Sequence, residues 1–382
     1  MAFLLYSYRG GSCLMKKLGI IAFALAFGVS LYVPAADLAV PNLELITRGY
    51  VSGGDFLLGT RGSVDFLVAG GYKFGGRVLL GFESNNLEDT ESEKDLEFKG
   101  AYVIMRNLFG IPIDLTYFTG ENDVFGRGTI FPTYFGAKPI ASRFSGYLYF
   151  PEENQIRYDG IHTVSGTGLK IASGFGSTAN LSALYIYQDS YLGTGTYSLD
   201  LFTAFNTDLF KMEAFLGASH PYSAAKYGYY RAGVLLFYDT GQGGEFLTQI
   251  GVPRWDPNVD RFTIDLFYFL FEPRVRFDFF SIILTLFWHP EYYLQQETNE
   301  LGSADINANF QFGDPDASIM SGGVESKLSL STTATEQFRA VIAPYFSTIT
   351  SGVIWDFKVN TQIFPWNIAE MFEVFVGVRA EF

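Results

Sequence analysis

The chain has 382 residues, enough for two ordinary soluble domains or for one large barrel. Aromatic residues make up 18 % and charged residues only 17 %, which would demand an unusually large core in a soluble protein but suits a barrel with one face in lipid. The net charge is −14, and the first 36 residues hold three of the 26 basic groups and none of the 40 acidic groups, so the rest of the chain carries −17 and argues against a nucleic-acid partner.

The N-terminal segment has the three-part layout of a secretory signal peptide. A charged start at Lys16 and Lys17 precedes the apolar run 18–31, and Val33 and Ala35 suit a small-residue cleavage site. The apolar run is shorter than the ~20 residues that a membrane-spanning helix needs. This pattern favours a cleaved leader, with an uncleaved anchor as the alternative.

These features divide the chain into a leader and one domain. We expect residues 1–14 to be an over-extended start, with initiation at Met15 and a signal peptide that ends at residue 35 or 36. Cys13, the only cysteine, then falls in the leader, which excludes disulfides and cysteine-bound zinc from the mature chain. No long repeat or linker interrupts residues 37–382, so we predict a single domain there.

Period-two alternation recurs along this domain and is clearest in 196–206, 304–312 and 352–364. In each segment one face is largely polar, as expected of a strand with water or a polar lumen on one side. We therefore predict an all-β fold, a transmembrane antiparallel β-barrel, because lipid tolerates no unpaired backbone. The residues predicted to line its lumen are Asp200, Asp305, Asn307, Asn309, Gln311, Asp356, Lys358, Asn360 and Gln362.

Short and long connections take turns along the chain, which is typical of a transmembrane barrel with turns on one rim and loops on the other. At about twenty residues for each ~10-residue strand and its connection, the domain predicts about 16 strands, with 14 to 18 compatible. Region 126–165 is irregular and predicts either short strands or a loop that folds into the lumen. The predicted strands are 63–72, 77–84, 96–105 and 111–118, with turns at 73–76 and 106–110 and loops at 85–95 and 120–126.

The last dozen residues alternate strictly and stop on an aromatic residue. This segment resembles the terminal strand of Gram-negative outer-membrane barrel proteins, whose final Phe and alternate apolar residues act as a signal for the barrel-assembly machinery. The resemblance implies an outer-membrane location, with outer-membrane lipid and that machinery as partners; it identifies no subfamily. The corresponding positions here are Phe372, Val374, Val376, Val378 and Phe382.

The residue inventory does not support an enzyme or a metal site. Of the three histidines, His162 lacks a serine two residues away, as the outer-membrane phospholipases would have, and His220 and His289 each precede a proline. Metal ligands are scattered, so we predict no metal and no cofactor. Calcium binding by acidic external loops is the one weak alternative.

Three functions remain open. The first is a passive porin-like channel for small hydrophilic solutes, with a mild cation preference because acidic groups exceed basic ones. The second is a non-conducting surface, structural or adhesin barrel that acts through its external loops. The third is an uptake channel for hydrophobic compounds, for which the hint is a dense group of aromatic residues: Phe131, Tyr134, Phe135, Phe144, Tyr147, Tyr149 and Phe150.

Overall fold

The computed structural model describes most of the chain after the leader. Residues 1–36, Glu381 and Phe382 lie outside the described residues, and so do most of the positions between 132 and 159. The predicted signal peptide and most of the aromatic group predicted between 131 and 150 therefore fall outside the described residues. The described residues are 37–84, 86–87, 94–131, 135, 137, 160–175, 180–190, 192, 195–207, 210–221, 228–258, 260–288, 290, 304–314, 318–330, 338–368 and 371–380.

The described chain folds into 18 strands and two short 3-10 helices, η1 (Leu108–Gly110) and η3 (Ile264–Leu266). Among the described residues, no helix is long and apolar enough to cross a membrane, a finding that does not bear on strands. The strands are β1 (Asp37–Ser52), β2 (Asp55–Gly70), β3 (Phe74–Ser84), β4 (Lys94–Met105), β5 (Ile113–Phe125), β6 (His162–Phe175), β7 (Asn180–Asp189), β8 (Thr196–Asn206), β9 (Phe210–Pro221), β10 (Tyr229–Asp239), β11 (Gly244–Trp255), β12 (Tyr268–Arg276), β13 (Phe280–Trp288), β14 (Ala304–Phe312), β15 (Met320–Leu330), β16 (Phe338–Thr350), β17 (Val353–Phe364) and β18 (Phe372–Ala380).

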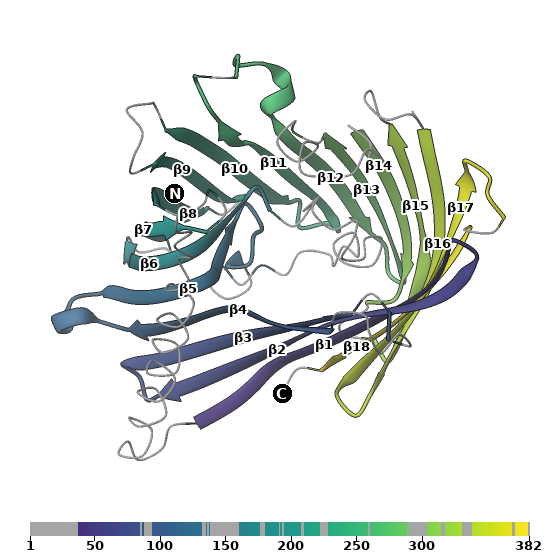
Figure 1. Cartoon of the computed structure of the whole chain (residues 1–382), viewed down its shortest axis with the longest axis horizontal. Helices are drawn as coiled ribbons and strands as arrows, with labels where there is room; N and C mark the ends of the chain where they lie inside the picture. Colours follow the sequence, from purple (N-terminus) through teal and green to yellow (C-terminus); the bar gives the residue numbers. More distant parts are fainter. Residues whose placement is uncertain are drawn as a thin grey trace, which may run out of the picture.

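Each strand pairs antiparallel with the next one in sequence, and β18 pairs with β1, so the sheet closes on itself (Figure 1). The closing seam runs from Leu43 opposite Ala380 to Tyr50 opposite Glu373. Closure gives every strand a neighbour on both sides, which is what allows a sheet to be stable in lipid. The predicted all-β antiparallel barrel is confirmed, with 18 strands at the upper end of the predicted range and above its centre of 16.

The two rims of the barrel differ in the length of their connections. One rim carries short connections such as 71–73, 176–179 and 351–352. The opposite rim carries longer ones, among them 85–93 and 126–161. β1 begins and β18 ends on the short-turn rim, since Asp37 lies opposite Ala69 and Ala380 lies opposite Val353. The predicted alternation of turns and loops is therefore present.

Alternation along the strands separates an apolar outer face from a largely buried inner face. On β17, Trp355 and Phe357 are 39 % and 43 % exposed, whereas Asp356 between them is 2 % exposed. On β18, the apolar face predicted from the sequence points outward: Phe372, Val374 and Val376 are exposed and Val378 is half-buried. An exposed apolar face that runs around the whole wall is unusual in a soluble protein.

One predicted boundary is wrong in a way that affects the interior. The sequence indicated a strand that ends at residue 118 and a loop over 120–126, but β5 continues to Phe125. In the sequence, residues 120–126 look like a turn because the segment begins with Gly120 and continues with three polar residues. They remain a strand because they pair with the start of β6, where Phe125 lies opposite His162, a partner 37 positions away in the chain that local sequence cannot reveal.

Candidate functional site in the barrel interior

The polar residues predicted for the lumen lie on the inner face of their strands. Their neighbours on β14 point outward, with Ile306 and Phe310 38 % and 50 % exposed. Whether this inner face carries solutes stays a prediction. Gln362 is half-buried, and the other eight predicted residues are at most 5 % exposed: Asp200, Asp305, Asn307, Asn309, Gln311, Asp356, Lys358 and Asn360.

The inner wall from β14 to β18 and β1 carries cross-strand ion pairs. Nζ of Lys327 lies 3.3 Å from Oδ2 of Asp305, and Lys358 pairs with Glu325 on the second strand over. Farther round the wall, Arg379 donates from Nε to Oδ2 of Asp356 at 3.0 Å. The seam itself is bridged by Arg48 Nη2 and Glu373 Oε1, 2.6 Å apart. Sequence analysis singled out Asp305, Asp356 and Lys358, but their partners depend on strand register.

Some polar atoms on this wall have no protein partner. Among the described residues, Nδ2 of Asn307, Oε1 of Glu325 and Oγ of Ser321 are buried and make no hydrogen bond within the protein. A buried polar atom without a partner costs about 1–3 kcal/mol. These atoms therefore favour a hydrated environment along β14 and β15.

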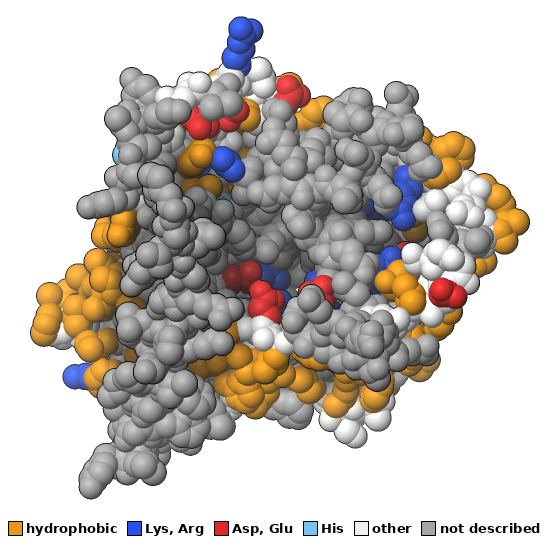
Figure 2. All heavy atoms as spheres, in the orientation of Figure 1, with side chains coloured by type: hydrophobic (Ala, Val, Ile, Leu, Met, Phe, Trp, Pro, Cys, Tyr) orange, Lys and Arg blue, Asp and Glu red, His pale blue; other side chains and the backbone are white. Residues whose placement is uncertain are grey.

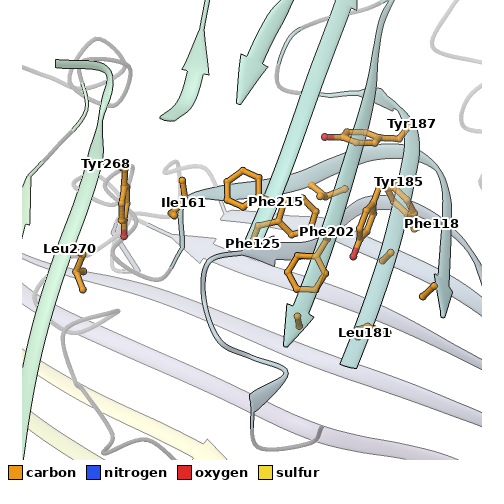
Figure 3. Close-up of a cluster of buried hydrophobic side chains, with 14 of the residues drawn as sticks. Phe118, Phe125, Ile161, Leu181, Tyr185, Tyr187, Phe202, Phe215, Tyr268 and Leu270 are labelled. Atoms are coloured by element: carbon orange, nitrogen blue, oxygen red, sulfur yellow. The ribbon is translucent and has the colours of Figure 1, made fainter. Parts of the chain in front are cut away.

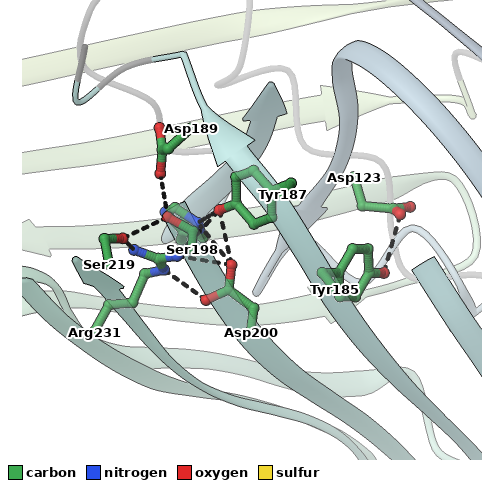
Figure 4. A network of polar contacts seen from close by, with 9 residues as sticks. Asp123, Tyr185, Tyr187, Asp189, Ser198, Asp200, Ser219 and Arg231 are labelled. Atoms are coloured by element: carbon green, nitrogen blue, oxygen red, sulfur yellow. Dashed lines mark hydrogen bonds and ion pairs between the residues drawn. The ribbon is translucent and has the colours of Figure 1, made fainter. Parts of the chain in front are cut away.

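A second polar network lies on β7 to β10 (Figure 4). Arg231 donates to both carboxylate oxygens of Asp200, at 2.6 Å from Nε and 2.8 Å from Nη2. The hydroxyl of Tyr187 donates to the same carboxylate at 2.8 Å, and Arg231 also donates to Ser219. Gly217 leaves room for this pair, because a Cβ there would lie 1.7 Å from Oδ1 of Asp200. Of the predicted lumen residues, Asp200 alone belongs to this network.

His162 lies at the edge of that network. Its Nε2 lies 3.3 Å from the hydroxyl of Tyr187 and 3.7 Å from Oδ2 of Asp200. Among the described residues, no group of three His, Cys, Asp or Glu side chains is placed to hold a metal ion. His289 lies outside the described residues.

The end of β5 and the start of β6 fold toward the barrel interior. The ring of Phe125 lies between 5.1 and 5.2 Å, centroid to centroid, from the rings of Tyr185, Phe202 and Phe215, which come from β7, β8 and β9 (Figure 3). All four side chains are buried. This aromatic cluster fills the interior beside β5 to β9.

The segment that follows β5 is fixed to the wall at β9, four strands away, by a buried carboxylate. Oε2 of Glu213 on β9 accepts the backbone N–H of Gly126 at 3.0 Å, and the backbone amides of Arg127 and Gly128 also hydrogen bond to this carboxylate. The side chain of Gln249 on β11 donates to the carbonyl oxygen of Gly126. The described part of 126–165 thus agrees with the inward-folding alternative, which the sequence left open.

Ile161 completes this anchor by packing over small residues. It is fully buried, and a Cβ added to Gly233 or Gly251 would lie 2.9 Å from one of its methyl carbons. Both glycines are on strands that the inward segment crosses, β10 and β11. A glycine on a strand often marks such a close approach, but the sequence alone does not reveal what approaches it.

The interior is therefore divided into two halves. Aromatic and aliphatic side chains, the inward segment and a few tightly paired charges such as Arg231 and Asp200 occupy the half beside β5 to β13. Polar and charged side chains cover the half from β14 through β18 to β1. Figure 2 shows a hollow near the middle of the visible face with acidic and basic side chains in it, and hydrophobic side chains along the outer margin.

Comparisons with known proteins yield structural neighbours only. No family model and no curated protein matches the chain. A five-site mutant of the porin of Rhodopseudomonas blastica is 11 % identical, with 91 % of this chain and all of that chain covered and a TM-score of 0.49. A three-site mutant of the same porin is 10 % identical over the same shares, with a TM-score of 0.43. At these values the likeness carries no argument, so the barrel assignment depends on the strand pairing itself.

Proposed function

We propose that the chain forms a porin-like channel in a bacterial outer membrane and passes small hydrophilic solutes with a mild cation preference. The observation that carries the proposal is the closed 18-stranded wall with an apolar outer face and a charged inner face. Only a closed sheet satisfies the backbone of strands in lipid. The polar half of the interior offers the path for solutes, and the activity is transport rather than catalysis.

The sign of the selectivity follows from the charges on the inner wall. Among the described residues, nine buried side chains are acidic and five are basic. The surplus of four acidic groups favours cations, as rings of acidic side chains do in other channels. Most of these groups are paired across strands, so the preference is expected to be mild. The acidic residues are Asp65, Asp189, Asp200, Glu213, Glu245, Glu272, Asp305, Glu325 and Asp356, and the basic ones are Arg48, Arg231, Arg274, Lys327 and Lys358.

Assembly in the outer membrane requires partners that are part of the same proposal. The outward apolar residues of β18 match the assembly signal that the C-terminal resemblance implies, and the lipid bilayer is the partner of the rest of the outer face. Phe382, the last position of that signal, lies outside the described residues.

The experiment is single-channel recording of refolded residues 37–382 in a planar bilayer under a salt gradient. Discrete conductance steps with a reversal potential that favours cations are the expected result. A reversal potential that favours anions would contradict the selectivity, and a folded barrel without current would contradict the channel.

A closed barrel that acts through its external loops is the second candidate. It is favoured by the burial of predicted lumen residues, because Asp200, Asn307 and Gln311 are at most 1 % exposed. The same recording separates the two candidates: the closed barrel would be heat-modifiable and folded but would carry no current, and deletion of a long-rim loop would abolish surface binding.

A further inference from the structure

The barrel wall is interrupted between β4 and β5. Backbone pairing of these strands covers only Gly100–Met105 with Leu115–Gly120. Toward the long-loop rim, residues 94–98 pair with β3, whereas Glu121 and residues 123–125 pair with β6, and the described registers contain no pair between these two stretches. The five residues 94–98, at about 3.3 Å each, correspond to about 16 Å of wall without pairing between β4 and β5.

Glycines and a bulge make this interruption a built feature. A Cβ on Gly100 would lie 2.3 Å from the carbonyl oxygen of Glu121. Gly120 has a φ of +81°, and its Cβ would lie 2.2 Å from the carbonyl oxygen of Lys99. A register shift between Glu121 and Asp123 then turns the strand. Other residue types would clash here, so the sequence specifies the departure of β5 from β4.

The departing strand end is held inside the barrel, which keeps the two edges apart. Phe125 is fixed by the aromatic cluster and Gly126 by Glu213, as described above. Strand β4 does not follow, because it stays paired with β3 through Lys94 opposite Ser84. The separation of β4 and β5 is therefore held by contacts of the strands themselves and does not depend on where the connecting loops lie.

A cavity of about 130 Å³ lies at the foot of this gap, where β5 leaves β4. Its lining combines Arg77, Tyr102 and the neighbouring Ala101 of the wall with Asp123 and Val124 of the inward strand end. The cavity therefore lies on the inner side of the wall, next to the end of the gap.

The outer approach to the gap is apolar. Leu96 and Phe98, on the outer face of the unpaired part of β4, are 75 % and 52 % exposed. Tyr117, on the outer face of β5 below the gap, is 54 % exposed. A molecule that arrives from the bilayer would meet these side chains first.

The charges at the cavity are balanced. Arg77 donates to both carboxylate oxygens of Asp65 at 2.6 Å, and Lys170 Nζ lies 2.8 Å from Oδ2 of Asp123. A site whose cations and anions already neutralise each other gives no net attraction to an ion of one sign. It can solvate a dipolar group, because donors and acceptors are both present. At about 30 Å³ per water molecule, the cavity has room for a small polar group.

From these observations we propose that the gap between β4 and β5 is a lateral opening that admits an amphipathic solute with a zwitterionic head from the bilayer. The head would occupy the cavity beside Arg77 and Asp123, and the apolar chain would lie along Leu96 and Phe98. This inference rests on the proposed membrane location. It assigns the protein a second route, separate from the polar path along β14 to β18.

The test uses fluorescence quenching at single cysteines in residues 37–382, which contain no cysteine of their own. Val124→Cys reports on the cavity, Val103→Cys on the outer face of β4, and Ile104→Cys on its inner face. Each variant is labelled with a bimane and reconstituted in phosphatidylcholine vesicles that contain a lysophosphatidylcholine with a nitroxide on its chain. We expect loss of fluorescence at Val124→Cys close to that at Val103→Cys and well above that at Ile104→Cys.

A second substitution checks that quenching occurs through the cavity. Leu79→Trp in the Val124→Cys background enters the cavity from the inner face of β3 and is expected to restore most of the fluorescence, whereas Ile104→Trp, on the inner face of β4 and outside the cavity lining, is the matched control. Quenching at Val103→Cys without quenching at Val124→Cys would overturn the lateral opening, whether the gap is closed or covered by a second copy. Absence of quenching at Val103→Cys would instead overturn the membrane location on which the inference rests.

Discussion

Release of the inward segment by a single substitution is the sharpest prediction of this interior. At pH 9, Glu213→Gln removes the charge that accepts the backbone amides of Gly126, Arg127 and Gly128. A hydrogen bond to a charged group contributes about 1.5–3 kcal/mol and a neutral one about 0.5–1.5 kcal/mol. With three such bonds weakened, the docked segment should lose about 3 kcal/mol relative to the released one, a factor of about 100 in their ratio.

Trypsin provides the assay, because it cleaves after Arg127 only when the surrounding backbone is released. When opening and closing are fast, the cleavage rate follows the population of the open form. Cleavage after Arg127 in the refolded barrel should therefore be about 100-fold faster in Glu213→Gln. Glu97→Gln is the matched control, since Glu97 is an exposed carboxylate on the inner face of β4. A cleavage rate after Arg127 equal to that of the unmodified chain would refute the anchoring role of Glu213.

Three further substitutions test other parts of the barrel. Gly233→Val should lower the free energy of unfolding in urea by about 1–3 kcal/mol through overpacking, because a Cβ there lies 2.6 Å from the ring of Phe215. Gly174→Ala is the control and should have little effect, because its Cβ meets nothing closer than 3.6 Å. Lys358→Gln leaves Glu325 without its cation, so the reversal potential under a salt gradient should move toward stronger cation preference, and a move toward anions would contradict the proposed lumen. Val376→Arg places a charge on the lipid face at the centre of β18 and should destabilise the folded barrel in bilayers by about 2–4 kcal/mol, and a stability in urea equal to that of the unmodified chain would contradict a lipid-facing position.

The strands with one polar face could be predicted closely from sequence. The predicted strand 304–312 coincides with β14, and 352–364 differs from β17 by one residue. Alternation is strict in these segments because one face must avoid water while the other carries polar groups. The strand count was less accurate, since connections such as 53–54, 207–209 and 351–352 are only two or three residues long, so that many strands with their connection take fewer than the twenty residues assumed.

The interior could be predicted only in part. Period two identified the inner-face residues of single strands, such as Asp356 and Lys358, because the pattern is local. The partners of these residues depend on cross-strand register, so Glu325 and Arg379 were missed. The anchor at Glu213 was also missed, since the donors to its carboxylate are backbone amides, which any sequence would supply.

The seam between β1 and β18 has a consequence for how the chain could be rearranged. The free ends of these two strands lie on the same short-turn rim, and the strands are already joined by backbone pairing and by the contact of Arg48 with Glu373. A short linker between them, with new ends placed in a long-rim connection such as 331–337, would give a circular permutant that keeps all 18 pairings. The hydrogen-bonded wall has no first or last strand, and only the order of synthesis distinguishes them.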